Sequence, residues 1–176
     1  MKKLTITFYL ALAGSSVLVG GVAAKSIGTL SAAFTQGGET YSHKEAGIQF
    51  ELPKGWKAKP DGETVTVSTP DDSLQMVFWV PDEDTFEAAV KALDKELDKT
   101  IKNLKTTGKP LEDTHNGMPH YAQSGTGEVS GVTIEWNVDV LAAKKVVLIL
   151  SFAAPGAWEK HADDAAKFIS SIKKIE

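Results

Sequence analysis

Cysteine and arginine are both absent from this sequence of 176 residues. Without cysteine, the chain has no disulfide framework, no thiol nucleophile, no cysteine-ligated zinc and no residue for N-terminal lipid attachment. Without arginine, all 19 basic residues are lysines, so no guanidinium is present to bind a phosphate, a carboxylate or a guanine edge in bidentate fashion. Together with a formal net charge of −4, these absences argue against nucleic acid as a partner.

The first 24 residues have the pattern of an export signal. Lys2 and Lys3 form a positive start, residues 4–22 are almost entirely apolar or small, and Val22-Ala23-Ala24 suits a signal peptidase, which predicts cleavage after Ala24. The alternative is an uncleaved membrane anchor, which would be the chain's only contact with a membrane. Both interpretations predict a periplasmic or extracellular domain. Cleavage would leave 17 lysines against 23 acidic residues, a net charge of −6.

The rest of the chain divides into a short arm and one domain. Residues 25–42 are rich in Ala, Gly, Ser and Thr without a sustained hydrophobic period, which predicts a flexible N-terminal arm. Hydrophobic residues make up 42% of the chain and charged residues 24%, as is typical of a domain with a buried core. We expect that domain to span residues 43–176.

Hydrophobic periodicity predicts six strands and two helices within the domain. Alternating residues indicate strands at 48–52, 64–67, 74–80, 119–127 and 132–140, and the apolar run 145–152 predicts a central strand of the sheet. A spacing of three or four predicts helices over 85–105 and 157–175, the first of them capped by Asp82 and Asp84. The predicted order is β-β-β-α-β-β-β-α, an α+β domain. The pattern leaves open whether both helices cover one face of the sheet.

Three short motifs resemble the domains of the PsbP-like and DcrB-like superfamily. They are the segment from Gly47 to Trp56, the turn Asn116-Gly117-Met118-Pro119, and the closing helix from Phe168 to Lys173. The resemblance extends over residues 41–176 and rests on turn and core positions. It implies an α/β/α sandwich around an antiparallel sheet, in a binding or accessory protein.

Catalytic motifs are missing from the sequence. It contains no Gly-x-Ser-x-Gly elbow, no phosphate-binding loop, no dinucleotide fingerprint and no His-Glu-x-x-His helix. The glycine-rich stretch from Gln123 to Gly127 lies within a predicted strand, so no helix N-terminus follows it to receive a phosphate. We therefore expect a protein that is not an enzyme.

A polar cluster is predicted on the hairpin that spans residues 119–140. If Ser130-Gly131 forms a two-residue turn, Val129 pairs with Val132 and the register of the hairpin follows. One face then carries His120 and Ser124 together with Glu135, Asn137 and Asp139. This face is either a ligand-binding surface or simply the solvated side of the sheet, and a slip of one residue would remove His120 from it.

A metal site is a further possibility near the preceding turn. Asp113, His115 and His120 are imidazole and carboxylate donors of the kind that suit Zn²⁺ or Mn²⁺, although their spacing matches no known ligand pattern. Acidic turns such as Asp71-Asp72 allow weak Ca²⁺ binding but follow no EF-hand pattern. His161 is expected on a solvated helix face.

Two functions are compatible with these observations. The first is an exported, non-catalytic accessory domain that has no cofactor and assists a protein or an envelope complex. The second is a periplasmic protein that binds a metal or a small ligand through the polar face of the hairpin.

Overall fold

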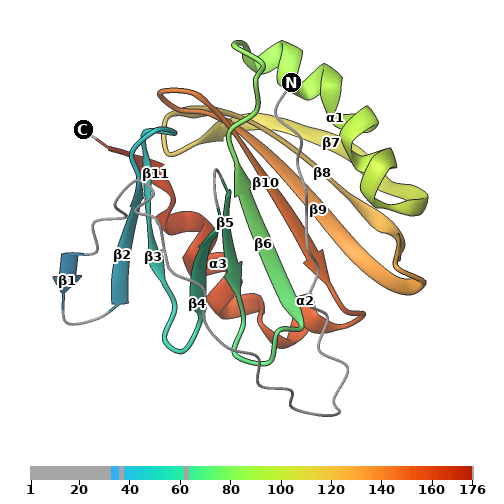
Figure 1. Ribbon diagram of the computed structural model, residues 1–176, viewed down its shortest axis with the longest axis horizontal. Helices are drawn as coiled ribbons and strands as arrows, with labels where there is room; N and C mark the ends of the chain where they lie inside the picture. The colour runs from blue at the N-terminus through green and yellow to red at the C-terminus, as the bar shows by residue number, and fades with distance from the viewer. Residues whose placement is uncertain (1–32, 36–37, 62–63, 176) are drawn as a thin grey trace.

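The computed structural model describes residues 33–35, 38–61 and 64–175 (Figure 1). The predicted signal segment and the first part of the predicted arm lie outside these ranges. Within them, no helix is both long enough and apolar enough to cross a lipid bilayer. The described residues thus belong to the later part of the predicted arm and to the predicted domain.

Seven antiparallel strands form the main sheet, in the order β4-β5-β6-β10-β9-β8-β7. Their bounds are Lys57–Asp61 (β4), Thr64–Ser68 (β5), Leu74–Trp79 (β6), Lys102–His115 (β7), Met118–Val129 (β8), Val132–Ala142 (β9) and Val146–Ala153 (β10). The five strands predicted in this part of the chain all exist, with ends that agree to within two residues. β10 is central and buried along its whole length, as its apolar sequence predicts.

A smaller sheet is built around β3, with the order β1-β2-β3-β11. Its strands are Ala33–Thr35 (β1), Gly38–His43 (β2), Ile48–Leu52 (β3) and Lys173–Lys174 (β11). The described end of the predicted arm is thus a strand that pairs with β3 from one end to the other. Composition did not indicate it, because the strand is polar and is held by backbone pairing, with Tyr41 stacked on Phe50 at a ring separation of 5.8 Å.

The first helix, α1, spans Phe86–Thr100 and is shorter than predicted. Thr85 caps it by accepting a hydrogen bond from the Ala88 amide, so the cap is not supplied by the aspartates named above. Ile101 is extended, and the chain continues directly into β7. Two threonines, a glycine and Pro110 follow in this strand, and all of them disfavour a helix.

The predicted second helix is also interrupted. It consists of a single turn, α2 (Ala157–Lys160), and a longer helix, α3 (Ala162–Ser171), separated at His161. Ile172 is extended and buried, and the next two residues form β11 on the edge of β3. The observed element order therefore differs from the predicted one, because β1, β2, β4, β7 and β11 were not expected.

The two long helices cover opposite faces of the main sheet, which the sequence left open (Figure 1). Alternate residues of β6 enter two separate hydrophobic clusters: Met76 and Phe78 pack with Phe168 of α3, whereas Val77 and Trp79 pack with α1. α3 also packs on β3, so the smaller sheet lies beside it. The α+β class is confirmed, with the sheet between the two helices.

α3 leaves part of its face of the main sheet uncovered. The uncovered part lies over β7, β8 and β9, and we call it the open sheet face; it consists of Leu111, Ala122, Ser124, Glu135 and Asn137. Ser124 is exposed, and the side chain of Leu111 is the most exposed of the large hydrophobic residues in the described part, at 52%. This half of the layer is therefore polar and open to solvent.

Candidate functional site

The hairpin of β8 and β9 has the register that its turn residues predict. Ser130 and Gly131 both have positive φ, at 53° and 81°, which suits a two-residue turn between strands. Val129 pairs with Val132, and His120 consequently pairs with Leu141. His120 and Asp139 thus lie on the same face, as expected.

His120 joins three neighbouring strands through its imidazole ring. Its Nδ1 lies 2.7 Å from Oδ1 of Asp113 on β7, and its Nε2 lies 2.9 Å from Oδ1 of Asp139 on β9. Asn137 Nδ2 donates a 2.6 Å hydrogen bond to the other oxygen of Asp139. We call these four residues the histidine network. It fixes the relative positions of β7, β8 and β9 at one end of the sheet.

Two carboxylates favour the protonated form of His120. The hydrogen bond with Asp139 is the largest influence that raises the pKa of His120 above its ordinary value of 6.5, and Asp113 adds to it. Burial acts in the opposite direction but does not outweigh them. The imidazole is therefore held as a cation at pH values where an exposed histidine would be neutral.

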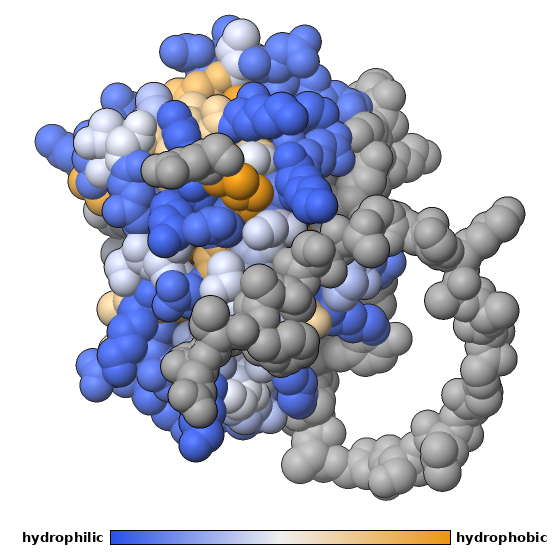
Figure 2. Space-filling view, turned by 90° about the vertical axis from the view of Figure 1, so that its left-hand side faces the viewer, coloured by the Kyte–Doolittle hydropathy of each residue, from blue (hydrophilic) through white to orange (hydrophobic). Residues whose placement is uncertain are grey.

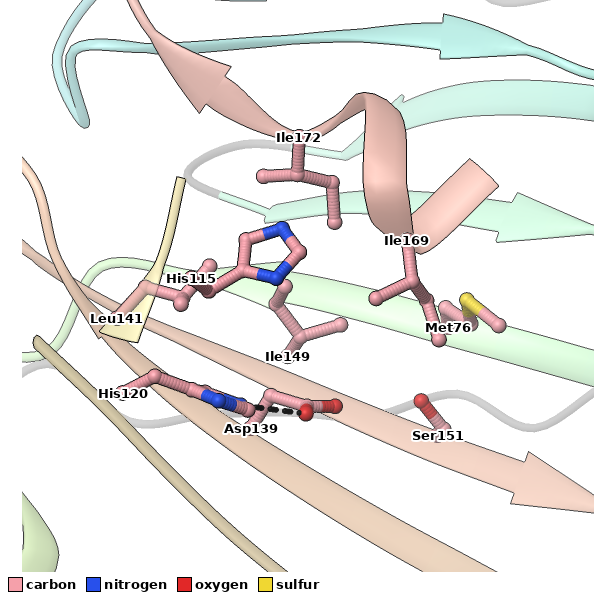
Figure 3. A pocket seen from close by; sticks show the side chains of 9 residues that line it. All are labelled: Met76, His115, His120, Asp139, Leu141, Ile149, Ser151, Ile169 and Ile172. Atoms are coloured by element: carbon pink, nitrogen blue, oxygen red, sulfur yellow. Dashed lines mark hydrogen bonds and ion pairs between the residues drawn. The ribbon is translucent and has the colours of Figure 1, made fainter. Parts of the chain in front are cut away.

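The histidine network borders a small cavity between the sheet and α3 (Figure 3). The cavity is lined by His120, Asp139 and Ser151, by His115, and by the hydrophobic side chains of Met76, Leu141, Ile149, Ile169 and Ile172. Its volume of about 10 Å³ is close to the space that one water molecule needs. The hydroxyl of Ser151 turns toward this space. A water molecule fits here, but a larger ligand does not.

The structure brings together some of the predicted ligand residues but not all of them. His120, Asn137 and Asp139 form one hydrogen-bonded group. Ser124 pairs with Asn137, and Glu135 lies two pairs further along the hairpin, opposite Thr126, so both belong to the open sheet face. The predicted cluster is thus a compact network next to a more open polar surface.

The predicted metal site does not have the geometry of a metal centre. His120 and Asp113 are in contact, but both ring nitrogens of His120 already face carboxylates. The rings of His115 and His120 meet edge to face with their centres 5.8 Å apart. Among the described residues, no group of three or more His, Asp or Glu side chains is arranged to hold a metal ion.

Another histidine is less exposed than the sequence suggested. The side chain of His161 is only 14% exposed, and its Nε2 lies 3.2 Å from Oδ1 of Asp71. Asp71 also accepts hydrogen bonds from Thr69, Ser73 and Lys160, and the lysine is the main reason why the pKa of Asp71 is well below its ordinary value. This cluster ties the start of α3 to the β5–β6 turn, so the prediction of a solvated histidine was wrong.

Asn116 is a residue whose role the sequence did not reveal. It lies in the turn between β7 and β8, with a φ of 47°. Its Nδ2 donates hydrogen bonds of 2.9 Å to the Ser170 carbonyl and 2.8 Å to the Ile172 carbonyl, at the C-terminal end of α3. The Asn-Gly pair predicted a turn, but no local pattern indicates a contact over more than fifty residues of chain.

Sequence comparison and structure comparison give different outcomes for this chain. No family model and no curated protein matches its sequence. LpqN of Mycobacterium tuberculosis, described as involved in cell envelope biogenesis, resembles it with a TM-score of 0.54 and 12% identity, over 72% of this chain and 82% of LpqN.

Two further solved structures have the same degree of likeness. Cyanobacterial PsbP from Synechocystis has a TM-score of 0.53 and 12% identity, over 86% of this chain and 97% of that protein. A protein from Bacteroides thetaiotaomicron has a TM-score of 0.53 and 13% identity, over 80% of this chain and half of that one. The chain therefore has a fold like that of PsbP, which the motifs near Gly47 and Asn116 implied. A likeness of this kind concerns the fold and does not assign a function.

Proposed function

We propose that this chain is an exported, non-catalytic binding domain that assists a protein partner or an envelope complex through its open sheet face. The observation that carries the proposal is the uncovered half of the sheet. Leu111 stands exposed among polar side chains there, on the edge strand β7, whose residues are almost all exposed. Protein interfaces combine an apolar centre with a polar rim, and Leu111 with its polar neighbours has this arrangement on a small scale.

The histidine network supports a binding role over a catalytic one. A catalytic histidine needs one nitrogen free to take a proton from a nucleophile or a water molecule. Both nitrogens of His120 face carboxylates, and the cavity beside them has room only for about one water molecule. The network therefore stabilises the sheet next to the open face, and the small cavity weighs against the alternative of a small-ligand protein.

Two further observations favour this function. The pattern of residues 1–24 predicts export, and LpqN, which has a similar fold, is described as involved in envelope biogenesis. On the side of the molecule that carries β2 and β3, hydrophilic residues predominate among the described residues and hydrophobic ones form only a small area (Figure 2). Since both surfaces are largely polar, the choice of the open sheet face rests on the exposed Leu111 and on the exposed edge strand β7.

Site-specific photo-crosslinking in cells that naturally make the full chain tests this proposal. A photoreactive amino acid would replace Leu111 or Ser124 on the open sheet face, and Glu87 on the exposed side of α1 as the control. We expect one envelope protein to be crosslinked from both open-face positions and not from position 87. The change Leu111→Asp should reduce its recovery in a pull-down with the full chain. Equal crosslinking from all three positions, or none from the open face, would contradict the proposal.

A further inference from the structure

The end of β7 and the turn after it contact two different parts of the molecule, β8 and the end of α3, within four residues of chain. Asp113 bonds to His120 on β8, and His115 packs its ring against the same imidazole. Asn116 donates both of its amide hydrogen bonds to carbonyls at the end of α3. A displacement of this segment would therefore reach the histidine network and the last turn of α3 together.

Side chains add to the backbone pairing that holds this segment against β8. β7 lies at the edge of the main sheet, where β8 alone of the described strands pairs with it, and the register shifts between Thr107 and Leu111. Thr114 pairs with Pro119, which has no N–H to donate to the sheet. The contact of Asp113 with His120 thus adds a side-chain link to the pairing of residues 111–115 with β8.

The proton count of the imidazole decides whether both carboxylates can be bonded. A histidine cation donates from both nitrogens, whereas the neutral ring donates from one and presents a lone pair at the other. Asp139 is the better partner for a single N–H because its side chain is 11% exposed, against 48% for Asp113, and because Asn137 holds it in place. In the neutral state the lone pair on Nδ1 would therefore face the carboxylate of Asp113.

Among the described residues, no other charged group that faces His120 reverses this argument. The titratable groups around the ring are Asp113 and His115 from β7 and Asp139 from β9. The parts of β6, β10 and α3 that line the same cavity contribute hydrophobic side chains and the Ser151 hydroxyl. The protonation of His120 is thus governed by the two carboxylates that flank its ring, with the imidazole of His115 as the remaining titratable neighbour.

We propose that His120 is a proton-controlled clamp: its protonated ring holds the end of β7 in place, and loss of the proton releases Asp113 and weakens the grip of Asn116 on the end of α3. The clamp concerns the conformation of this chain and does not depend on the proposed partner. The raised pKa of His120 gives the direction of the effect. Its contribution to stability is fully present below the ordinary histidine value of 6.5 and is lost as the pH rises through the folded value.

Nuclear magnetic resonance of the isotope-labelled full chain, between about pH 5 and above pH 8, tests the clamp. The ring nitrogens of His120 report its protonation, and the side-chain amide of Asn116 reports the contact with α3. We expect His120 to titrate above 6.5 and the Asn116 amide to shift with the same midpoint. If the Asn116 resonance stays constant while His120 titrates, or if His120 titrates at or below 6.5, the clamp does not exist.

Three variants separate the clamp from other causes. In His120→Gln, the shift of the Asn116 amide should disappear. His115→Gln is the matched control, because Nε2 of His115 lies 3.4 Å from Nδ2 of Asn116 and could report its own titration; the shift should persist there. Asp113→Asn changes a half-exposed side chain without opening the core, and it should lower both midpoints together. Unchanged midpoints in Asp113→Asn, or a shift lost only in His115→Gln, would overturn the proposal.

Discussion

Trp136 requires a glycine at the neighbouring position of β8, because its buried ring leaves no room for a side chain at Gly125. The indole is 1% exposed and its Nε1 donates a 3.0 Å hydrogen bond to the Thr126 carbonyl. A Cβ atom at position 125 would lie 2.0 Å from the Lys105 carbonyl oxygen and 2.6 Å from the nearest ring atom of Trp136. The glycine-rich stretch, which no helix N-terminus follows to form a phosphate site, is thus explained by close packing of β7, β8 and the indole.

The change Gly125→Ala should destabilise the domain by about 1–3 kcal/mol, because the new methyl group overlaps backbone and ring atoms that have little freedom to move. Urea unfolding followed by tryptophan fluorescence measures the loss. Ser124→Ala is the matched control on the same strand, and its exposed side chain should make the change nearly neutral. Equal stability of the two variants would show that the close approach is not as tight as described.

At this scale, the sequence predicted part of the histidine network. The turn chemistry of Ser130-Gly131 set the register, and the register brought His120 and Asp139 together. The sequence grouped Asp113 with His120 only as possible metal ligands, and it did not predict their direct contact, because no strand was expected at residues 106–115. Ser151 was also missed, since it lies in an apolar strand where nothing marks a polar position.

At the scale of elements, the boundary between α1 and β7 shows where periodicity misleads. Ile101 and Leu104 continue the helical spacing of the preceding residues, and both pack into the cluster beneath α1. The backbone at both residues is extended and not helical, since Ile101 follows the end of α1 and Leu104 lies in β7. Both side chains are therefore buried without belonging to a helix. Hydrophobic spacing records which side chains are buried, and it does not distinguish the end of a helix from the strand that follows.

The C-terminal end of α3 depends on a residue from another element. Because the last carbonyls of a helix lack partners within it, the amide of Asn116 satisfies two of the groups in this region. The change Asn116→Gly keeps the positive φ available and should cost about 1–3 kcal/mol through the two lost hydrogen bonds.

Asn103→Gly is the matched control for this experiment. Asn103 is an exposed asparagine on β7 with a φ of 51°, and it makes no side-chain hydrogen bond within the described part of the chain. Chemical denaturation of both variants isolates the contribution of the contact with α3. A loss in Asn116→Gly no larger than that in Asn103→Gly would mean that the cap contributes nothing to stability.

At the scale of the whole molecule, two hydrophobic clusters share one sheet. Phe168 of α3 is fully buried and contacts Phe50, Trp56 and Phe78, which come from the smaller sheet, the loop after it and the main sheet. One aromatic ring therefore joins the helix to both sheets. The hydrophobic pattern predicted that Phe168 lies on the buried side of its helix, but it could not predict which strands meet it, because these contacts cross most of the chain.

The change Phe168→Ala should lower the free energy of unfolding by about 3–5 kcal/mol, since it leaves a large cavity at the junction of three elements. Lys167→Ala, at the neighbouring position, is the control; its side chain is 77% exposed and its ion pair with Asp164 is a surface contact. Thermal and urea unfolding would compare the two. A loss of less than about 1 kcal/mol in Phe168→Ala would indicate that this junction relaxes around the missing ring.

The pairing of β3 has a mechanical consequence for the molecule. β2 and β11 flank β3 and both run antiparallel to it, so the two strands point in the same direction. A pull on the chain before Gly38 and a pull beyond Lys174 would act in opposite directions along β3. The bonds of the small sheet would then be loaded in shear, all at once, rather than opened one after another. Tension between the two ends of the domain would thus be carried across the strand where they come together.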